Sequence, residues 1–343
     1  MNLSDFPHRR LNPLTGEYVL VSPHRSKRPW LGKVENAPPT AQVKHDPNCY
    51  LCPGNKRAEG AINPDYKSAW AFTNDFSALL SKVPVESMDQ QGLLVAQTES
   101  GVCRVVCFSP RHDLTLSRMQ TPEIENVIEV WTDEYKTLGS DPNINYVQIF
   151  ENRGDIMGCS NPHPHCQIWA SRSVPDIPAS EDAHQAAWHS QKGRCLLCDY
   201  LKLELTEKSR LVCQNDEFVV IVPFWAVWPF ETMVLPREHI GDLSGFTPAL
   251  RSGFADILSR ITRRYDQLFQ TSFPYSMGIH QTPTDGKEHP GWHFHAHFLP
   301  PLLRSATVKK FMVGYELLAR PQRDISPETT AERLRHCPEE QLS

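Results

Sequence analysis

Residues 160–169 of the chain read SNPHPHCQIW, with two histidines one residue apart and a glutamine two residues further on. The closing Ile-Trp pair favours an extended strand, and the Asn-Pro pair marks the end of the preceding loop. Because side chains two residues apart share one face of a strand, His163, His165 and Gln167 are expected to line up at spacings of about 6–7 Å. An imidazole held on a strand beside an amide donor suits attack on phosphorus, whereas the alternative is a pair of metal-binding or surface histidines.

The composition is that of an ordinary globular protein, with 40% hydrophobic and 22% charged residues among 343. The net charge of −5 gives no electrostatic reason to expect a nucleic-acid partner. No apolar run approaches the length of about 18 residues that a membrane span requires, and the first residues lack a signal-peptide pattern. A cytoplasmic location is therefore expected, with the ten cysteines acting as metal ligands or free thiols rather than disulfides.

The two halves of the chain repeat the same motifs in the same order. Each has a Cys-x-x-Cys pair, a strand-like run ending at a proline and a histidine, a Thr-Pro helix start, a strand and a His-x-His strand. The matching segments are Cys49/Cys52 with Cys195/Cys198, 103–112 with 231–239, 121–138 with 247–268, 146–150 with 275–279, and His163/His165 with His295/His297. This order indicates an internal duplication of an α+β unit, with a mainly antiparallel sheet flanked by helices.

Both predicted helices carry apolar residues at steps of three to four, which is typical of a helix that packs on a core. Thr121 and Thr247 are the expected N-caps, each followed by proline at the first helical position. The seam between the halves is expected near residues 172–190, and it separates an N-terminal half, 1–178, from a C-terminal half, 179–343. A surface helix is expected within roughly residues 324–343.

The first Cys-x-x-Cys pair, Cys49 and Cys52, has the spacing that allows two thiolates to bind one tetrahedral ion. Two further ligands are needed, and His112 and His163 are the best candidates because they occupy matching places in the first half. The sequence therefore predicts a Cys2His2 zinc site that ties the loop to the catalytic strand. The alternative is a pair of reduced cysteines.

The second half ends in a histidine-rich segment. His293, His295 and His297 alternate on one predicted strand face, and three imidazoles together need a reason because they repel one another when charged. A second metal, iron or zinc, accounts for them, with His280 as a neighbour on the preceding strand and a carboxylate completing the set. His289 is expected to be a loop residue.

Further motifs extend over nearly the whole chain. They read HRRLNPLTG at 8–16, FTNDF at 72–76, FEN at 150–152, CSNPHPH at 159–165, FPYSMG at 273–278, HAH at 295–297, LLRSAT at 302–307 and KFMVGYE at 310–316. Together these motifs resemble the galactose-1-phosphate uridylyltransferase family, whose members are duplicated relatives of the histidine-triad proteins. The resemblance implies two histidine-triad-like units and a homodimer in which sugar-side residues reach across the interface.

The resemblance also implies the reaction and its residues. UMP would pass from UDP-glucose to galactose 1-phosphate, giving UDP-galactose and glucose 1-phosphate, through a uridylyl group on His165; this is the transfer step of the Leloir pathway of galactose metabolism. The implied ligands are Cys49, Cys52, His112 and His163 for Zn²⁺, and Glu181, His280, His295 and His297 for Fe²⁺ or a second Zn²⁺. The implied substrate contacts are Arg25, Arg28, Ala58, Asn74, Asp75, Asn152, Ser160 and Gln167 on the nucleotide side, and Lys310, Phe311, Tyr315, Glu316 and Gln322 on the sugar side.

Gln167 favours transfer over hydrolysis. Water must lose a proton to attack, so a hydrolase gains from an acid/base side chain, and related hydrolases carry a third histidine here, as the resemblance implies. A sugar phosphate is already an anion, and an amide can donate to a phosphoryl oxygen without moving protons. The alternatives are a histidine-triad nucleotide hydrolase, a transferase of other base or sugar specificity, and a zinc-based binding module.

The second Cys-x-x-Cys pair admits two interpretations. By the repeat, Cys195, Cys198 and His239 correspond to three ligands of the first site, and the fourth would be His295, which the second metal site also needs. Either the C-terminal half binds a zinc ion of its own, or these thiols are a remnant of duplication; the sequence alone favours the remnant. His293 is expected to offer an alternative ligand to the second metal.

Overall fold

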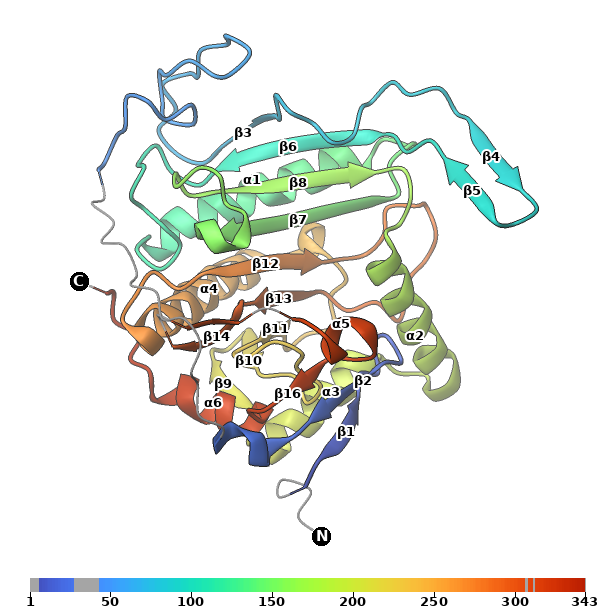
Figure 1. Cartoon of the computed structure of the whole chain (residues 1–343). Helices are drawn as coiled ribbons and strands as arrows, with labels where there is room; N and C mark the ends of the chain where they lie inside the picture. Colours follow the sequence, from blue (N-terminus) through green and yellow to red (C-terminus); the bar gives the residue numbers. More distant parts are fainter. Residues whose placement is uncertain (1–5, 28–42, 306–307, 311, 343) are drawn as a thin grey trace.

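The computed structural model describes residues 6–27, 43–305, 308–310 and 312–342. A nine-stranded antiparallel sheet runs through the body of the molecule (Figure 1). Its spatial order is β3 (Trp70–Thr73), β6 (Gly101–Cys107), β8 (His165–Ser171), β7 (Tyr146–Arg153), β12 (Tyr275–His280), β13 (His295–Leu299), β11 (Thr232–Pro236), β10 (Phe218–Ile221) and β9 (Leu211–Gln214). The predicted α+β class with a mainly antiparallel sheet is confirmed.

The strand order shows the duplication. The order β6-β8-β7 of the first half is repeated in reverse by β12-β13-β11 of the second half, where β12 corresponds to β7, β13 to β8 and β11 to β6. The two halves therefore meet where β7 pairs with β12. Ile149 of β7 lies opposite Ile279 of β12, and both side chains are buried. Because this hydrogen-bonded ladder crosses from one half to the other, the halves share one sheet, and the boundary between residues 178 and 179 stays a prediction.

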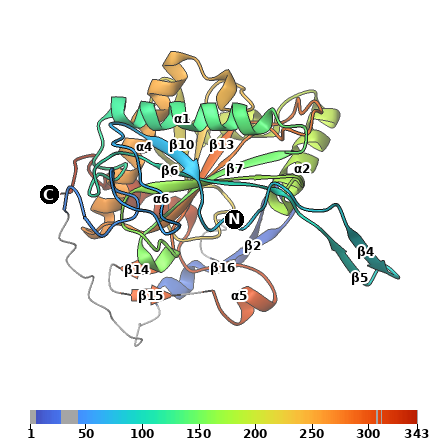
Figure 2. The same ribbon diagram turned by 90° about the horizontal axis from the view of Figure 1, so that it is seen from above.

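Two long helices, α1 (Thr121–Gly139) and α4 (Pro248–Phe269), lie side by side on one face of the sheet (Figure 2). Their predicted apolar stripes are buried in the main core, as Trp131 and Phe254 illustrate. Thr247 caps α4, since its hydroxyl accepts a hydrogen bond from the amide of Leu250 at 3.2 Å. The prediction of Thr121 as the N-cap is wrong by one residue. The N-cap of α1 is Gln120, whose main-chain N–H donates to the Glu123 carboxylate.

The opposite face of the sheet carries a second core. On β10, Val220 packs into the main core, whereas its neighbours Val219 and Ile221 pack into the second one, as the two-residue period of a strand requires. This face is covered by helices α2 (Asp176–Lys192) and α3 (Leu196–Glu207), and by a three-stranded sheet of β1 (His8–Leu11), β2 (Tyr18–Val21) and β16 (Gln322–Arg323). Helix α2 occupies the predicted seam and brings Glu181 beneath the large sheet.

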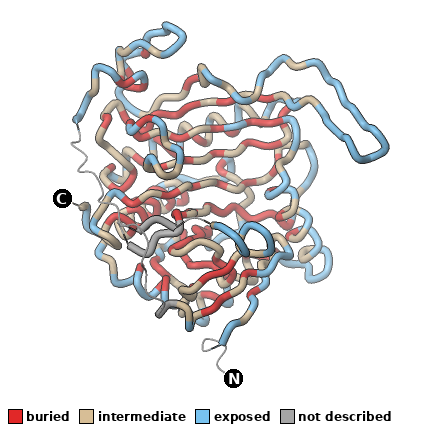
Figure 3. Tube along the Cα trace, viewed as in Figure 1, coloured by how far each residue is buried: buried red, intermediate tan, exposed pale blue. Residues whose placement is uncertain are grey.

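Shorter elements complete the described chain. The predicted tail helix is present as α6 (Pro327–His336), which packs on α4 and β9 through buried residues such as Leu334. The remaining elements are η2 (Pro23–Lys27), β4 (Ser87–Gln90), β5 (Leu94–Gln97), η3 (Asp155–Met157), η4 (Leu243–Gly245), β14 (Leu302–Ser305), β15 (Val308–Lys310) and α5 (Tyr315–Leu318). The β4-β5 hairpin projects from the body and is exposed along its length (Figure 3). None of the helices in the described ranges has both the length and the apolar character needed to cross a membrane.

Candidate active site and metal centres

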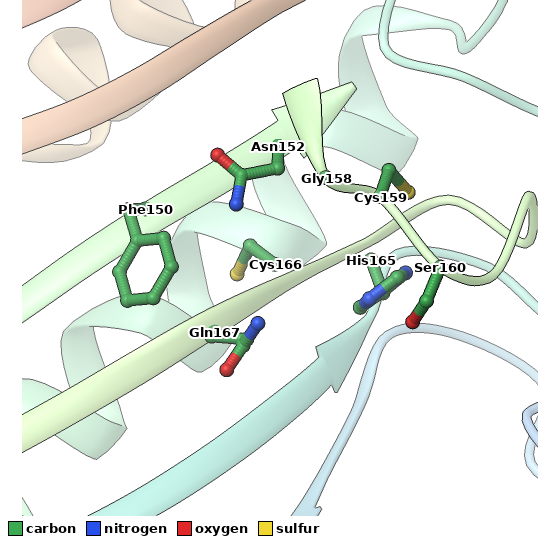
Figure 4. A pocket seen from close by; sticks show the side chains of 8 residues that line it. All are labelled: Phe150, Asn152, Gly158, Cys159, Ser160, His165, Cys166 and Gln167. Atoms are coloured by element: carbon green, nitrogen blue, oxygen red, sulfur yellow. The ribbon is translucent and has the colours of Figure 1, made fainter. Parts of the chain in front are cut away.

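A polar pocket opens beside the first residues of β8. The chain enters β8 from an irregular loop after β7, and this loop supplies the rim on one side. Figure 4 shows the lining residues, which are Phe150, Asn152, Gly158, Cys159, Ser160, His165, Cys166 and Gln167. Four of the predicted site residues, Asn152, Ser160, His165 and Gln167, therefore meet in one place.

The ring of His165 is fixed by the main chain. Its Nδ1–H donates a hydrogen bond of 2.7 Å to the carbonyl oxygen of His163, so Nε2 carries the lone pair. Burial lowers the pKa of His165, although the bond to His163 opposes this shift. A neutral imidazole with a fixed tautomer is the state in which a histidine side chain can act as a nucleophile.

Two amides in the pocket are oriented by neighbours. The indole N–H of Trp169 donates to Oε1 of Gln167 at 3.0 Å, and the Ser276 hydroxyl donates to Oδ1 of Asn152 at 2.7 Å. Each oxygen is thereby engaged, and each NH2 group remains a donor for a ligand. In Figure 4 the nitrogen end of Gln167 lies on the side of His165.

Sequence reasoning missed both orienting residues. Trp169 stands two positions after Gln167, on the same face of the strand, so its position was available as a signal. Ser276 faces Asn152 only through the register between β12 and β7, which the linear sequence does not contain.

The expectation that His163 shares a strand face with His165 and Gln167 is wrong. Strand β8 begins at His165, and His163 lies before it with its ring turned toward Cys52, 3.4 Å from Nδ1 to the sulfur. His163 contributes to the pocket through its carbonyl oxygen, which accepts the hydrogen bond from Nδ1–H of His165, and not through its ring.

The first Cys-x-x-Cys pair meets the two predicted histidines. The ligand atoms of Cys49, Cys52, His112 and His163 all lie within 4.8 Å of one another. Nε2–H of His163 donates to the Ser109 carbonyl at 2.9 Å, which leaves Nδ1 with its lone pair toward the sulfur atoms. Burial lowers the pKa of His112 and lowers that of His163 to about 4, so both rings are neutral, as metal ligation requires.

A second group lies where α2 meets β12 and β13. Oε2 of Glu181 is 2.8 Å from Nδ1 of His280 and 3.2 Å from Nε2 of His295, and Oε1 is 3.9 Å from Nε2 of His297. Burial would raise the pKa of Glu181, but the facing imidazoles hold it well below its usual value. Within the described chain, Nε2 of His297 is buried without a hydrogen-bond partner. An ionised carboxylate with three converging imidazoles fits a divalent cation.

A third group corrects the predicted pairing of the repeat. Cys195, Cys198 and His239 converge with His293, whereas His295 belongs to the Glu181 group. His295 as fourth partner is therefore wrong, and so is His293 as an alternative ligand for the second metal. His293 lies before β13, as His163 lies before β8, so His165 corresponds to His295. The predicted loop residue His289 does lie in the β12–β13 loop, between the carboxylates of Asp182 and Asp285.

Arg25, Gln322, Tyr315 and Glu316 are not among the residues that line the His165 pocket. Nη1 of Arg25, in η2, donates to Oε1 of Gln322 at 3.3 Å. This bond brings a nucleotide-side candidate and a sugar-side candidate together although they are 297 positions apart in the sequence. Glu316 accepts from Arg323 at 2.5 Å, beside the same three-stranded sheet, and Tyr315 is 54% exposed.

Three nucleotide-side candidates stand on the segments around β3. Oδ1 of Asn74 accepts from the amide of Phe76, which makes the turn that local sequence favoured, and Asp75 is 3.6 Å from Arg57. Ala58 is exposed in the loop after the first Cys-x-x-Cys pair. None of these three lines the His165 pocket as described. Arg28 and Phe311, and the side chain of Lys310, lie outside the described residues.

Comparison with known proteins identifies relatives over nearly the whole chain. The family model described as galactose-1-phosphate uridyl transferase, N-terminal domain, matches residues 1–175, and the model of its C-terminal domain matches residues 181–343. Galactose-1-phosphate uridylyltransferase of Haemophilus influenzae is 49% identical over 97% of this chain and 95% of its own length. The enzyme of that name from Rattus norvegicus is 50% identical over 98% of this chain and 89% of its own.

Solved structures with the same fold also align with nearly the whole chain. A uridylyltransferase structure is 27% identical, with a TM-score of 0.75 over 96% of this chain and 97% of that one. An ADP-glucose phosphorylase from Arabidopsis thaliana, solved with bound ADP-glucose, is 22% identical with a TM-score of 0.75 over 96% of this chain and 99% of that one. The second likeness concerns the fold alone.

Proposed function

Because the chain belongs to the galactose-1-phosphate uridylyltransferase family of nucleotidyltransferases, we propose that it transfers UMP from UDP-glucose to galactose 1-phosphate. The products are UDP-galactose and glucose 1-phosphate. The observation that carries the proposal is the hydrogen bond from Nδ1–H of His165 to the His163 carbonyl, which aims a neutral Nε2 into the pocket. The reaction is then a double displacement in which His165 is alternately uridylylated and released.

The first displacement forms a bond between Nε2 of His165 and the α-phosphorus. The bond from that phosphorus to the bridging oxygen breaks, and glucose 1-phosphate leaves with the electron pair. Since Nδ1 keeps its proton, the uridylylated ring is a cation, and the His163 carbonyl at 2.7 Å stabilises that charge. In the second displacement a phosphate oxygen of galactose 1-phosphate attacks the same phosphorus and the imidazole leaves as the neutral base.

The amides of Gln167 and Asn152 are the proposed donors to the phosphoryl oxygens and the nucleotide. Both are held by their own oxygens, through Trp169 and Ser276, so the donor groups are in place before substrate arrives. Ser160 on the pocket rim is a further donor. An amide cannot accept a proton from water, so Gln167 supports transfer over hydrolysis. Hydrolysis would be the reaction of the alternative function, a histidine-triad nucleotide hydrolase.

The metal ions are proposed to hold the strands that carry the chemistry. Cys49, Cys52, His112 and His163 have the donor set of a closed structural zinc site, which would fix the loop before His165. Glu181, His280, His295 and His297 offer three nitrogens and a carboxylate, a set suited to Fe²⁺ or Zn²⁺. In this position either ion would link α2 to the middle of the large sheet.

The sugar-side residues are proposed to act in a homodimer. In a separate polar region beside the small sheet, the sugar-side candidate Gln322 accepts from Arg25 of the nucleotide side, and Glu316 accepts from Arg323, whereas neither lines the pocket that contains His165. Exposed apolar side chains lie close to this region in sequence, with Leu317 70% and Leu318 88% exposed. Exposed apolar residues next to candidate substrate contacts support a partner subunit that covers them and completes the site.

The test is a labelling experiment with UDP-glucose that carries radioactive phosphorus in the α-position. We expect acid-labile label on the protein and release of glucose 1-phosphate before any acceptor is added, followed by loss of the label when galactose 1-phosphate is supplied. A hydrolase would instead release UMP steadily without acceptor. Absence of label together with normal transfer would contradict the double displacement.

A further inference from the structure

Beyond the two metal groups of the proposed function, we propose that Cys195, Cys198, His239 and His293 form a third metal site, specific for zinc. The four ligand atoms lie within 4.8 Å of one another. They come from three segments that are far apart in sequence: the start of α3, the loop after β11 and the residues before β13. Two thiols and two imidazoles are the donor set of a structural zinc site.

The spacing of the ligand atoms matches a coordination tetrahedron. Metal–nitrogen bonds of about 2.0 Å and metal–sulfur bonds of about 2.3 Å give tetrahedron edges of about 3.3–3.8 Å. Sγ of Cys198 is 3.5 Å from Nδ1 of His239 and 3.4 Å from Nδ1 of His293, and Sγ of Cys195 is 3.6 Å from Nδ1 of His293. The two Nδ1 atoms are 3.4 Å apart. These four of the six edges fall in the range that one central ion would impose, and the remaining two, from Cys195 to Cys198 and to His239, are within 4.8 Å.

The orientation of the rings also points to a cation. Nε2–H of His293 donates to the Pro236 carbonyl at 3.2 Å, so its Nδ1 presents a lone pair to the group. Nδ1 of His239 lies 3.4 Å from this nitrogen, so the two ring nitrogens face each other across the group. They repel each other unless Nδ1 of His239 carries a proton or a cation lies between them. A metal ion bound to both nitrogens and to the sulfur atoms satisfies both lone pairs, and the Pro236 carbonyl then fixes the tautomer of a ligand.

The same arrangement occurs in the first half of the chain. Cys52 lies 3.6 Å from Nδ1 of His112 and 3.4 Å from Nδ1 of His163, and the other nitrogen of His163 donates to a main-chain carbonyl. Both halves therefore use Nδ1 atoms, a Cys-x-x-Cys pair and a carbonyl that holds the second histidine. The retention of this detail in the C-terminal half argues against the interpretation of these thiols as an inert remnant.

The third site would support the neighbouring Glu181 group. The carbonyl of His293 accepts a hydrogen bond of 2.8 Å from Nδ1 of His295, which directs Nε2 of His295 toward Glu181. Zinc bound to the ring of His293 would fix this carbonyl, as the first site would fix the carbonyl that orients His165. Cys195 and His293 are 98 positions apart, so the ion would also cross-link two distant parts of the C-terminal half.

The experiment is metal analysis by mass spectrometry of the purified full-length protein. We expect Cys195→Ser/Cys198→Ser to lose one zinc ion per chain relative to the wild type, while Cys337→Ser, at the end of α6, keeps the full zinc content. Glu181→Ala identifies the metal bound by the neighbouring group. When Glu181→Ala is combined with the double variant, we expect the protein to lose both this metal ion and the zinc ion of the third site. Zinc content in the folded double variant equal to that of the Cys337→Ser protein would overturn the proposal.

A second series covers the case in which the double variant does not fold. His239 lies on an exposed loop, so its replacement leaves the core intact. We expect His239→Ala to release one zinc ion per chain to a colorimetric chelator much faster than the wild type, and His239→Cys, which restores a fourth ligand, to recover slow release. Equal release rates for all three proteins would overturn the site, whether or not uridylyl transfer occurs.

Discussion

The carbonyl oxygen of His163 accepts a 2.7 Å hydrogen bond from Nδ1 of His165, so one residue offers its ring to a metal group and its main chain to the nucleophile. Replacing His165 with asparagine removes Nε2 from the pocket. We expect uridylyl transfer to fall by roughly 10⁴-fold or more, since no covalent intermediate can form. Steady-state rates and the labelling experiment measure the effect.

A matched control for this variant is His336→Asn, at the exposed end of α6. It should transfer at the wild-type rate. Near-normal exchange by the His165→Asn protein would rule out this residue as nucleophile.

Replacing Gln167 with histidine tests the distinction between transfer and hydrolysis. The variant places a proton acceptor where the wild type has only an amide, so a water molecule near the uridylylated ring can be deprotonated. We expect the ratio of hydrolysis to transfer to rise, detected as UMP released from UDP-glucose without galactose 1-phosphate. An unchanged ratio, in a variant that still becomes labelled, would argue against this role for Gln167.

Replacing Trp169 with phenylalanine tests the orientation of Gln167. The ring contact with Phe150, at 5.7 Å between centroids, can be retained, but the indole N–H that holds Oε1 is lost. A neutral hydrogen bond is worth about 1 kcal/mol, so we expect kcat to fall by about 5-fold with little change in KM.

Trp188→Phe is the matched control for this substitution, because its indole N–H also donates a hydrogen bond, to Asp199 between α2 and α3. It should leave kcat unchanged. Equal effects of the two substitutions would indicate a general loss of stability rather than a role in the pocket.

Much of the fold was predictable because it depends on local periodicity. The apolar stripe that includes Trp131 and the Thr-Pro start at Thr247 gave both long helices, and short strands followed from their β-branched residues. The internal repeat also predicted three of the four ligands in the third metal group, Cys195, Cys198 and His239. The fourth was wrong because the repeat aligned His163/His165 with His295/His297, whereas His163 corresponds to His293.

The correct match follows from three-dimensional roles. His163 and His293 turn their rings to cysteines before their strands begin, while His165 and His295 donate Nδ1–H to the carbonyl two residues back. Spacing alone cannot show which member of an alternating series lies before the strand. In the same way, the contact between Arg25 and Gln322 depends on β16 pairing with β2, a long-range parallel contact without a local signal.

The buried carboxyl of Glu231 gives a prediction on stability and pH. Burial raises its pKa to about 7, although amide hydrogens of Val227 and Trp228 donate to its Oε2 and oppose the shift. In the unfolded chain the pKa is about 4.5, so between these values the unfolded state releases a proton that the folded state keeps. The native state therefore loses stability as pH rises from about 4.5 to 7, by at most about 3 kcal/mol.

Glu231→Gln removes this titration while its amide oxygen can still accept both hydrogen bonds. We expect the free energy of unfolding of the variant, relative to the wild type, to increase as pH is raised from 5.5 to 8, measured by urea denaturation at each pH. Histidines titrate in the same range but are common to both proteins, so they cancel in the difference. Glu207→Gln, on the exposed end of α3, should show a difference that does not vary with pH. A relative stability of Glu231→Gln that does not change between pH 5.5 and 8 would mean that the carboxyl is already ionised in the folded protein.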